Sequence, residues 1–229
     1  MTMPAARLGT TRASYDTVAA DYAELLAAEL DKKPLDRAML AAFAEVVRAA
    51  GAGPVADVGC GPGRVTAHLT GLGVTAFGVD LSPGMIEVAR RRHPDLEFGV
   101  GSMTALDIED GTLGGVLAWY STCHTPLEQL PSAYAEFHRV LAPGGHLLTA
   151  FKVGGEQVHL DRAYGHEVDL DVYRHGPDEV AALLTKAGFV VTGRLTREAD
   201  VDGSYRESTA QAFIMATRSD IPLAPRPTR

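Results

Sequence analysis

Residues 57–64 read Asp-Val-Gly-Cys-Gly-Pro-Gly-Arg, at the end of a short apolar run over 54–58 and directly before a segment of helical character. Glycines between a strand and a helix let the backbone turn sharply and let a ligand approach where a Cβ would otherwise stand. The helix that follows presents free N–H groups and the positive end of its dipole to an anionic group. This stretch therefore predicts a ligand-binding turn between the first strand of a sheet and a helix.

The spacing of the glycines and two acidic residues narrow the kind of ligand. The glycines are spaced G-x-G-x-G, and Arg64 stands where a dinucleotide-binding fingerprint has its third glycine. No Gly-Lys-Ser/Thr follows, which excludes a P-loop. Asp57 lies two positions before the first glycine, and Asp80 ends the next apolar run. A carboxylate at the end of a second strand can accept hydrogen bonds from ribose hydroxyls, so an adenosine-containing ligand is predicted.

Strand-like and helix-like segments alternate around this turn. Alternation of this kind predicts an α/β fold, with a parallel sheet covered by helices on both faces. We expect helices over 14–31 (with Ser14 as N-cap), 35–50, 64–72, 83–92, 127–141 and 177–187, and strands over 54–58, 74–79, 96–100, 114–119, 146–151, 189–196 and 210–217.

Three segments fall outside this alternation. Residues 1–13 are expected to form a loose tail, and the polar segment 152–175 a long loop near the site, since long loops in compact domains are usually functional. The expected organisation is an N-terminal helical lid segment over 1–50, one core domain over 51–219 and a proline-rich disordered tail over 220–229.

Composition limits the partners. The 229 residues carry a formal net charge of −8, which disfavours broad contact with nucleic-acid phosphates or an anionic membrane. No uncharged apolar stretch is long enough to span a membrane, and the N-terminus lacks the apolar run of a signal peptide. Cys60 and Cys123 match neither a disulfide framework nor a zinc spacing. We therefore expect a cytoplasmic monomer or homodimer with no membrane and no nucleic-acid partner.

The order of several motifs resembles a known family. Asp57-x-Gly59-x-Gly61-x-Gly63, followed by Val79-Asp80, is similar to the first two motifs of class I, Rossmann-like S-adenosylmethionine-dependent methyltransferases. Later motifs of the family are resembled, in order, by Leu81-Ser82-x-x-Met85, Gly101-Ser102-Met103, Ala118-Trp119-Tyr120-Ser121 and Leu141-x-Pro143-Gly144-Gly145. The family often has Asp where this chain has Ser102. The resemblance implies a single doubly wound, seven-stranded, mostly parallel sheet of order 3-2-1-4-5-7-6, whose last strand is antiparallel.

The same resemblance implies S-adenosyl-L-methionine as the cofactor. Asp57 would face the amine of its methionine part, Asp80 would hold the ribose, and the side chains after the second and third strands would enclose the adenine. The cofactor-binding residues it implies are Tyr22, Asp57, Gly59, Cys60, Gly61, Gly63, Asp80, Leu81, Met85, Ser102, Met103 and Trp119.

The methyl acceptor is expected at the carboxyl edge of the sheet, where open α/β folds bind ligands. Tyr15, Tyr120 and Phe151 are the candidate substrate-binding residues. His124, just past the fourth strand, is the candidate catalytic base, because an imidazole titrates near neutral pH; the alternative is that His124 caps the next helix or bonds a backbone group. The histidines within 152–175 invite a metal interpretation, but we find no convincing ligand set and expect no metal.

The predicted function is transfer of a methyl group to a small-molecule acceptor, by O- or N-methylation. No Asn/Asp-Pro-Pro-Tyr/Phe sequence follows the fourth strand and no recognition domain is appended, which disfavours nucleic-acid and protein acceptors. Two alternatives stay open. One is a catalytically inactive module that binds S-adenosylmethionine. The other is an NAD-dependent oxidoreductase, against which the glycine spacing argues.

Overall fold

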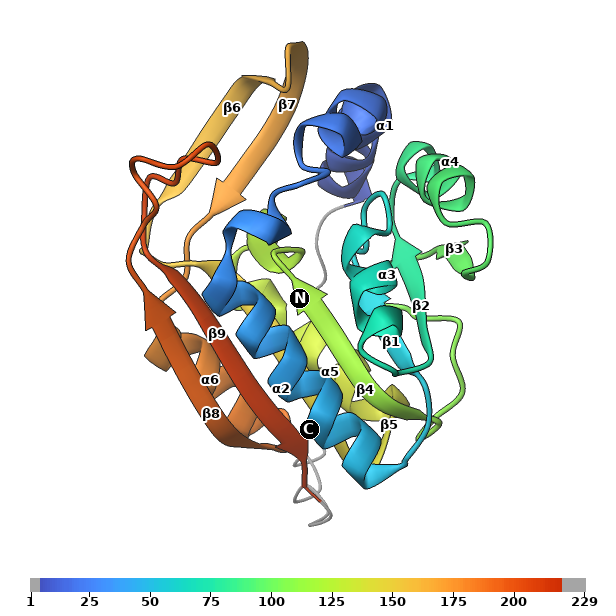
Figure 1. Ribbon diagram of the computed structural model, residues 1–229. Helices are drawn as coiled ribbons and strands as arrows, with labels where there is room; N and C mark the ends of the chain where they lie inside the picture. The colour runs from blue at the N-terminus through green and yellow to red at the C-terminus, as the bar shows by residue number, and fades with distance from the viewer. Residues whose placement is uncertain (1–4, 220–229) are drawn as a thin grey trace.

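The computed structural model describes residues 5–219, in which seven strands form one sheet of order β3-β2-β1-β4-β5-β9-β8 (Figure 1). Only β9 runs against its neighbours β5 and β8. Numbered among themselves, the strands follow the predicted order 3-2-1-4-5-7-6, which is thereby confirmed, as is the antiparallel last strand. Their bounds are β1 Val55–Val58, β2 Ala76–Asp80, β3 Phe98–Val100, β4 Leu113–Trp119, β5 Leu141–Lys152, β8 Phe189–Arg197 and β9 Gln211–Arg218.

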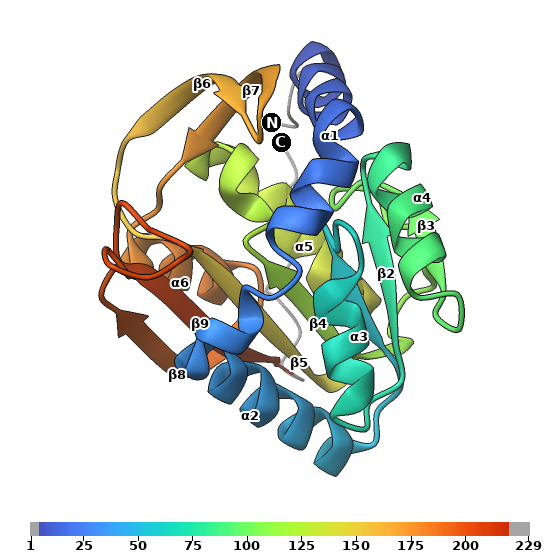
Figure 2. The same ribbon diagram turned by 45° about the horizontal axis from the view of Figure 1, so that its top comes forward.

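Helices cover both faces of the sheet, as the alternation predicts (Figure 2). Buried apolar side chains join α2 and α3 to one face, and a second buried cluster joins α5 and α6 to the other. The helix α4 packs beside β3 and against α1. The bounds are α1 Ala5–Leu25, α2 Pro34–Ala50, α3 Arg64–Gly71, α4 Pro83–Arg92, α5 Leu130–Val140 and α6 Pro177–Lys186, with short 3-10 turns η1 Leu30–Lys32, η2 Thr122–His124 and η3 Leu127–Gln129.

The N-terminal helix is longer than expected. The expectation of a loose tail over 1–13 is wrong for residues 5–13, which belong to α1. The proposed N-cap, Ser14, lies inside this helix, and its hydroxyl accepts a hydrogen bond from the backbone N–H of Asp169 at 3.0 Å. Tertiary contacts of this kind stabilise a helix whose own sequence has weak amphipathic character.

The segment 152–175 is not an irregular loop. It forms an antiparallel hairpin of β6 (Gln157–Ala163) and β7 (His166–Tyr173), outside the main sheet. Tyr164 and Gly165 make the turn with positive φ values of 53° and 85°. Both figures show this hairpin beside α1, above the carboxyl ends of the parallel strands. The hairpin and α1 together form what we call the roof of the site.

The described residues contain neither a membrane-spanning helix nor a cluster of metal ligands. Among residues 5–219, no helix is long and apolar enough to cross a membrane. The same residues contain no group of three or more potential metal ligands placed to hold an ion. The expected disordered tail over 220–229 lies outside the described residues.

Candidate functional site

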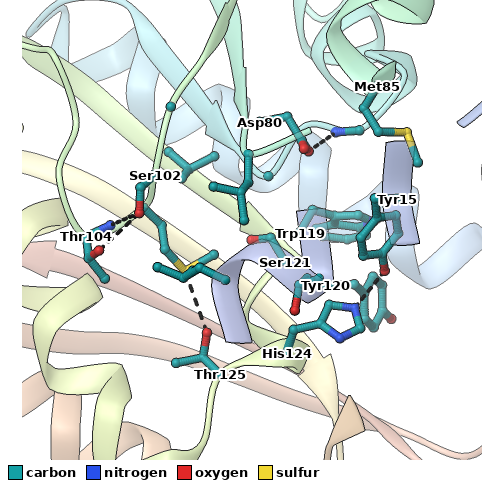
Figure 3. A pocket seen from close by; sticks show the side chains of 18 of the residues that line it. Tyr15, Asp80, Met85, Ser102, Thr104, Trp119, Tyr120, Ser121, His124 and Thr125 are labelled. Carbon is teal, nitrogen blue, oxygen red and sulfur yellow. Dashed lines mark hydrogen bonds between the residues drawn. The ribbon is translucent and has the colours of Figure 1, made fainter. Parts of the chain in front are cut away.

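A cavity of about 120 Å³ opens at the carboxyl edge of the parallel strands, under the roof (Figure 3). Its floor, as we use the word, consists of the loop 59–63 and the ends of β1, β2 and β4. Eleven of the predicted cofactor and substrate residues line this cavity together with the predicted base, His124: Tyr15, Tyr22, Gly59, Gly61, Asp80, Leu81, Met85, Ser102, Met103, Trp119 and Tyr120.

Two glycines of the floor have different tasks. Both have left-handed backbones, with φ of 78° at Gly59 and 54° at Gly61. A Cβ on Gly59 would stand 2.2 Å from the Cβ of Ser121, so no side chain fits there. A Cβ on Gly61 would meet no atom nearer than 3.9 Å, a ring carbon of Tyr22. Gly59 therefore lets two segments of the protein meet, whereas Gly61 leaves open space beneath the roof.

Asp80 ties the glycine loop to the end of β2. Its two carboxylate oxygens accept hydrogen bonds of 2.8 Å from the backbone N–H groups of Gly61 and Ser82. Burial raises the pKa of Asp80, although these two N–H groups oppose the rise. A carboxylate oxygen has room for a second hydrogen bond, so Asp80 can hold the loop and still accept from a ligand hydroxyl.

Asp57 lies behind the loop, at the end of β1, and borders a second, smaller cavity with Tyr22 and Trp119. One of its oxygens accepts a hydrogen bond from the Thr66 hydroxyl at 2.7 Å. The other, Oδ1, is buried and has no partner within the part of the chain that is described. Burial raises the pKa of this carboxyl to about 7. A buried acceptor without a donor is costly, and a cationic donor from a ligand would satisfy it.

The far side of the cavity is apolar. Met85, capped through its backbone N–H by the Ser82 hydroxyl at 3.0 Å, is almost fully buried. Met103 approaches from the loop after β3, where the Ser102 hydroxyl lies 3.0 Å from that of Thr104. Trp119 ends β4 and packs against Phe213. These side chains form the apolar surroundings that a flat heterocycle prefers.

His124 stands where η2 meets the cavity. Its Nε2 lies 2.6 Å from the Tyr15 hydroxyl of α1, and its Nδ1 lies 2.7 Å from the backbone oxygen of Asp171 on β7. Burial by itself would lower the pKa of His124, but the adjacent Cys123 and the Asp171 carbonyl favour the charged ring and raise it. Three segments far apart in sequence thus meet at one imidazole.

The roof is held together by contacts between α1 and the hairpin. Tyr22 packs edge-on against Tyr164 at 4.9 Å between ring centroids. His166 Nε2 lies 2.6 Å from a carboxylate oxygen of Asp21, and Arg7 pairs with Asp171. The hairpin histidines that suggested a metal therefore face acidic residues of the protein itself.

Tyr120 has a strained backbone at the end of β4. Its φ of 54° is rare for a residue with a side chain, and such conformations persist where the surroundings enforce them. Its hydroxyl reaches Asp36 Oδ2 at 3.4 Å, and Asp36 is itself paired with the guanidinium of Arg197 at 2.8 Å. A buried ion-pair network thus supports this wall of the cavity from behind.

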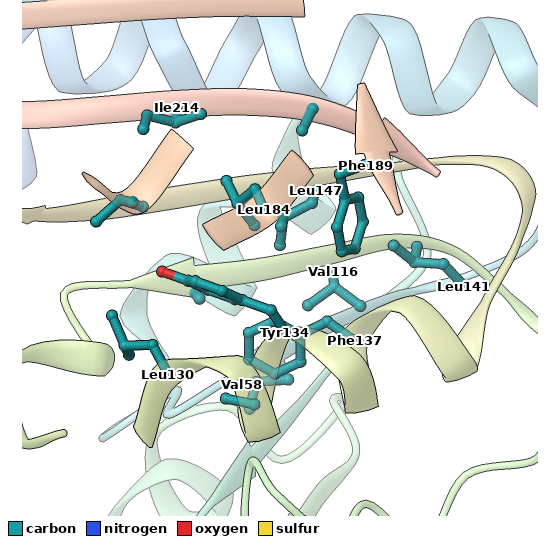
Figure 4. Packing of buried hydrophobic residues seen from close by; sticks show 14 of the residues in the cluster. Val58, Val116, Leu130, Tyr134, Phe137, Leu141, Leu147, Leu184, Phe189 and Ile214 are labelled. Atoms are coloured by element: carbon teal, nitrogen blue, oxygen red, sulfur yellow. The ribbon is translucent and has the colours of Figure 1, made fainter. Parts of the chain in front are cut away.

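Besides Asp57, three predicted residues lie away from the main cavity. Cys60 borders the smaller cavity with Asp57. Gly63 lines neither cavity, and a Cβ there would meet the Phe98 ring at 2.7 Å. Phe151 is completely buried beside His175. It belongs to the cluster of buried apolar residues between the sheet and the helices α5 and α6, and Figure 4 shows other members of this cluster. The structure therefore places Phe151 in the core and not at the cavity.

Other lining residues were not among the predicted site residues, although Gly101 and Ser121 belong to motifs quoted above: Leu8, Thr11, Val58, Gly101, Thr104, Ser121, Thr125 and Gln129. Leu8 and Thr11 were not considered because residues 1–13 were expected to form a loose tail. Positions 8, 11, 15 and 22 follow the spacing of one helix face, a signal that could have placed them together. The hairpin also had a signal, because apolar residues alternate with polar ones on both sides of Gly165.

The sequence similarity to known proteins covers the segment that forms the floor of the cavity. Residues 55–145 match a family model described as a methyltransferase domain. A demethylmenaquinone methyltransferase of Renibacterium salmoninarum is 35% identical over 108 residues, which make up 46% of this chain and 45% of the relative. A malonyl-acyl-carrier-protein O-methyltransferase of Serratia marcescens is 30% identical over 108 residues, 47% of this chain and 42% of the relative. The matches thus span less than half the length of these curated relatives.

A solved structure extends the likeness to the fold. The magnesium protoporphyrin IX methyltransferase of Synechocystis PCC 6803, crystallised with bound S-adenosylmethionine, aligns with a TM-score of 0.68 over 96% of this chain and 100% of its own, at 14% identity. The matched family segment contains the glycine loop, both acidic residues and His124. Residues 55–145 therefore match the methyltransferase-domain family, and the chain has the fold of a class I, Rossmann-like S-adenosylmethionine-dependent methyltransferase.

Proposed function

We propose that this chain transfers the methyl group of S-adenosylmethionine to a small-molecule acceptor, by O- or N-methylation. The observation that carries the proposal is one cavity in which the glycine loop and Asp80 lie on one side and Tyr15 and His124 on the other. Cofactor and acceptor can then meet above the end of β4, where open α/β folds bind ligands.

The residues present fit the cofactor. The unpartnered Asp57 Oδ1 is placed to accept a hydrogen bond from an ammonium group, and Asp80 retains acceptor capacity for ribose hydroxyls. The space above Gly61 leaves room for the chain between them. Leu81, Met85 and Met103 would hold the adenine. When bound, the sulfonium supplies an already activated methyl group, so alignment and exclusion of water are the main tasks of the protein.

His124 is proposed as the base that receives the acceptor proton. Its raised pKa makes it a stronger proton acceptor than an ordinary histidine. We propose α1 as a lid that closes with the hairpin over both ligands, whereas α2 serves as a layer of the core. The net charge and the two buried free cysteines support a small-molecule enzyme of the cytoplasm, as a monomer or homodimer, without nucleic-acid or membrane partners.

Calorimetry with S-adenosylhomocysteine tests the cofactor assignment. We expect binding in the micromolar range, roughly −7 to −8 kcal/mol. Tighter binding of NAD in a parallel titration would favour an oxidoreductase. Transfer of labelled methyl to a panel of hydroxyl- and amine-bearing metabolites then separates an enzyme from an inactive binding module, because the module would bind the cofactor and label nothing.

A further inference from the structure

The two ring nitrogens of His124 face groups of different chemistry. The partner of Nδ1 is the backbone oxygen of Asp171, 2.7 Å away, and a carbonyl oxygen can only accept. Nδ1 must therefore carry a proton. In the neutral ring, Nε2 is then the acceptor, and the Tyr15 hydroxyl 2.6 Å away must be the donor.

This arrangement leaves Nε2 no free position for an acceptor molecule. Its lone pair is occupied by Tyr15, which lines the cavity, and His124 as a residue is only 9% exposed. The Tyr15 oxygen, by contrast, still has lone pairs after donating its proton to His124. A group in the cavity can donate to that oxygen. The phenol thus stands between the cavity and the base.

We propose that Tyr15 is a catalytic proton relay and that the acceptor is a hydroxyl compound; this inference rests on the proposed methyl transfer. As the acceptor oxygen forms its bond to the methyl carbon, the carbon–sulfur bond breaks and its electron pair stays on sulfur. The hydroxyl proton of the acceptor passes to the Tyr15 oxygen, and the proton of Tyr15 passes to His124 Nε2. The ring becomes an imidazolium that donates to both Tyr15 and Asp171, and the positive charge of the sulfonium is replaced by that of the ring.

The chemistry of the acceptor follows from the need for a relay. An alcohol or phenol keeps its proton until the methyl group arrives, so a positioned base accelerates the reaction. A carboxylate has no proton to lose, and a neutral amine can attack first and lose its proton later. Burial raises the pKa of Tyr15 far above its usual value, so the phenol passes a proton on without resting as a phenolate.

The relay also needs a closed roof. Tyr15 belongs to α1, His124 to η2 and the Asp171 carbonyl to β7. The hydroxyl of Ser14, next to Tyr15, bonds the backbone of Asp169, and Arg7 pairs with Asp171. The contacts that join helix and hairpin are therefore the ones that hold the donor and the carbonyl on either side of the ring.

Nitrogen NMR of the full chain labelled with 15N-histidine tests the relay without any acceptor. The His124 signals are identified among the eight histidines by their loss in His124→Gln. At a pH where the ring is neutral, we expect a proton on Nδ1 and a hydrogen-bonded, unprotonated Nε2. In Tyr15→Phe, which keeps the packing ring, Nε2 should shift toward the value of a nitrogen without a donor. The control Tyr164→Phe, which removes a roof phenol that does not touch His124, should leave the signal unchanged.

A proton on Nε2 of the neutral ring, or an Nε2 signal that ignores Tyr15→Phe, would overturn the relay. Neither result depends on cofactor binding, which calorimetry with S-adenosylhomocysteine measures separately. With a hydroxyl acceptor from the labelling panel, Tyr15→Phe should lower turnover by about 10²-fold or more at unchanged affinity for S-adenosylhomocysteine, and the loss should shrink for more acidic hydroxyls. Unchanged or faster turnover would mean that the acceptor reaches His124 directly.

Discussion

The floor of the cavity is built from the backbone of the sheet, whereas the roof is held by side-chain contacts between two segments outside the sheet. In the floor, Gly59 touches Ser121 and Asp80 bonds two backbone N–H groups. In the roof, the pair of Asp21 with His166 is largely solvent-exposed. Buried, backbone-bound contacts contribute far more to stability than exposed ion pairs do. The stability of the fold should therefore depend mainly on the floor, whereas the proposed opening and closing of the cavity should depend on the roof.

The largest effect is expected at Asp57, whose buried carboxyl should destabilise the free protein at neutral pH. The pKa of this carboxyl is about 7 in the folded chain against an ordinary 3.8, so the folded state binds the proton more tightly. Stability should fall as pH rises between these two values, by about 1.4 kcal/mol per pH unit and roughly 4 kcal/mol altogether. Asp57→Asn should remove this loss, so that above pH 7 the variant is the more stable in urea unfolding.

Toward pH 4 the stabilities of Asp57→Asn and of the parent should become equal. The control Asp161→Asn, at an exposed position, should not alter the dependence of stability on pH. The same carboxyl sharpens the cofactor assignment. If its charge meets the ammonium of S-adenosylhomocysteine, the affinity of the parent should rise through pH 7, and that rise should be absent in Asp57→Asn. A pH-independent affinity of the parent for S-adenosylhomocysteine would show that the Asp57 carboxyl does not contact the ligand.

Gly59→Ala is expected to cost about 3 kcal/mol of folding stability. The new methyl group would overlap the Cβ of Ser121, and the residue would also hold a left-handed backbone. Gly61→Ala is the matched control, because it has the strained backbone and open space, so its cost should be near 1 kcal/mol. Its methyl group should instead weaken binding of S-adenosylhomocysteine. Equal denaturation midpoints for the two variants would contradict the distinction between them.

Asp80→Ala should reduce both stability and affinity, each by about 1–3 kcal/mol. Removal of the carboxylate leaves the N–H groups of Gly61 and Ser82 without acceptors and leaves a ribose hydroxyl unpaired. Thermal unfolding and calorimetry measure the two losses separately. An unchanged affinity in a less stable variant would show that Asp80 orders the loop without touching the ligand.

The smallest stability effect is expected in the roof. Arg7→Ala removes the pair with Asp171 but should change the free energy of unfolding by less than about 1 kcal/mol, since Arg7 is more than a third exposed. Amide exchange across 157–173 should become faster, while exchange in α5 stays the same. Arg12→Ala, on the same helix with only a 3.9 Å contact to Asp16, is the control and should alter neither. A loss comparable to that of Gly59→Ala would mean that the roof is part of the folding core.

The difference between floor and roof also explains which parts of the fold and of the site could be predicted from the sequence. The floor could be predicted from local sequence pattern. The glycine loop and the acidic residue at the end of the next strand lie within about 25 residues of each other, and together they indicate a ligand-binding turn between neighbouring strands. The roof depends on pairs such as Arg7 with Asp171, more than 160 positions apart in sequence. Exposed polar residues on both strands of the hairpin masked its alternation, so 152–175 resembled a loop.

Single residues show the same limit. Phe151 lies in the core because its side chain projects from β5 into the cluster with α5 and α6, and the face of the sheet that it occupies was not considered when it was assigned to the cavity. His124 was placed near the cavity from its position after β4. Its hydrogen bonds to Tyr15 and Asp171 were beyond sequence reasoning, because they depend on where α1 and β7 dock.

The hairpin leaves and re-enters the fold at nearly the same place. Val153 and His175 form a bridge, and the N–H of His175 donates to the oxygen of Lys152 at 2.9 Å. A segment whose ends meet can be lengthened, shortened or exchanged with little strain on the sheet, since only two adjacent attachment points must match. Natural variation or grafting of the hairpin can therefore change the roof above the cavity while the sheet and the glycine loop below it stay the same.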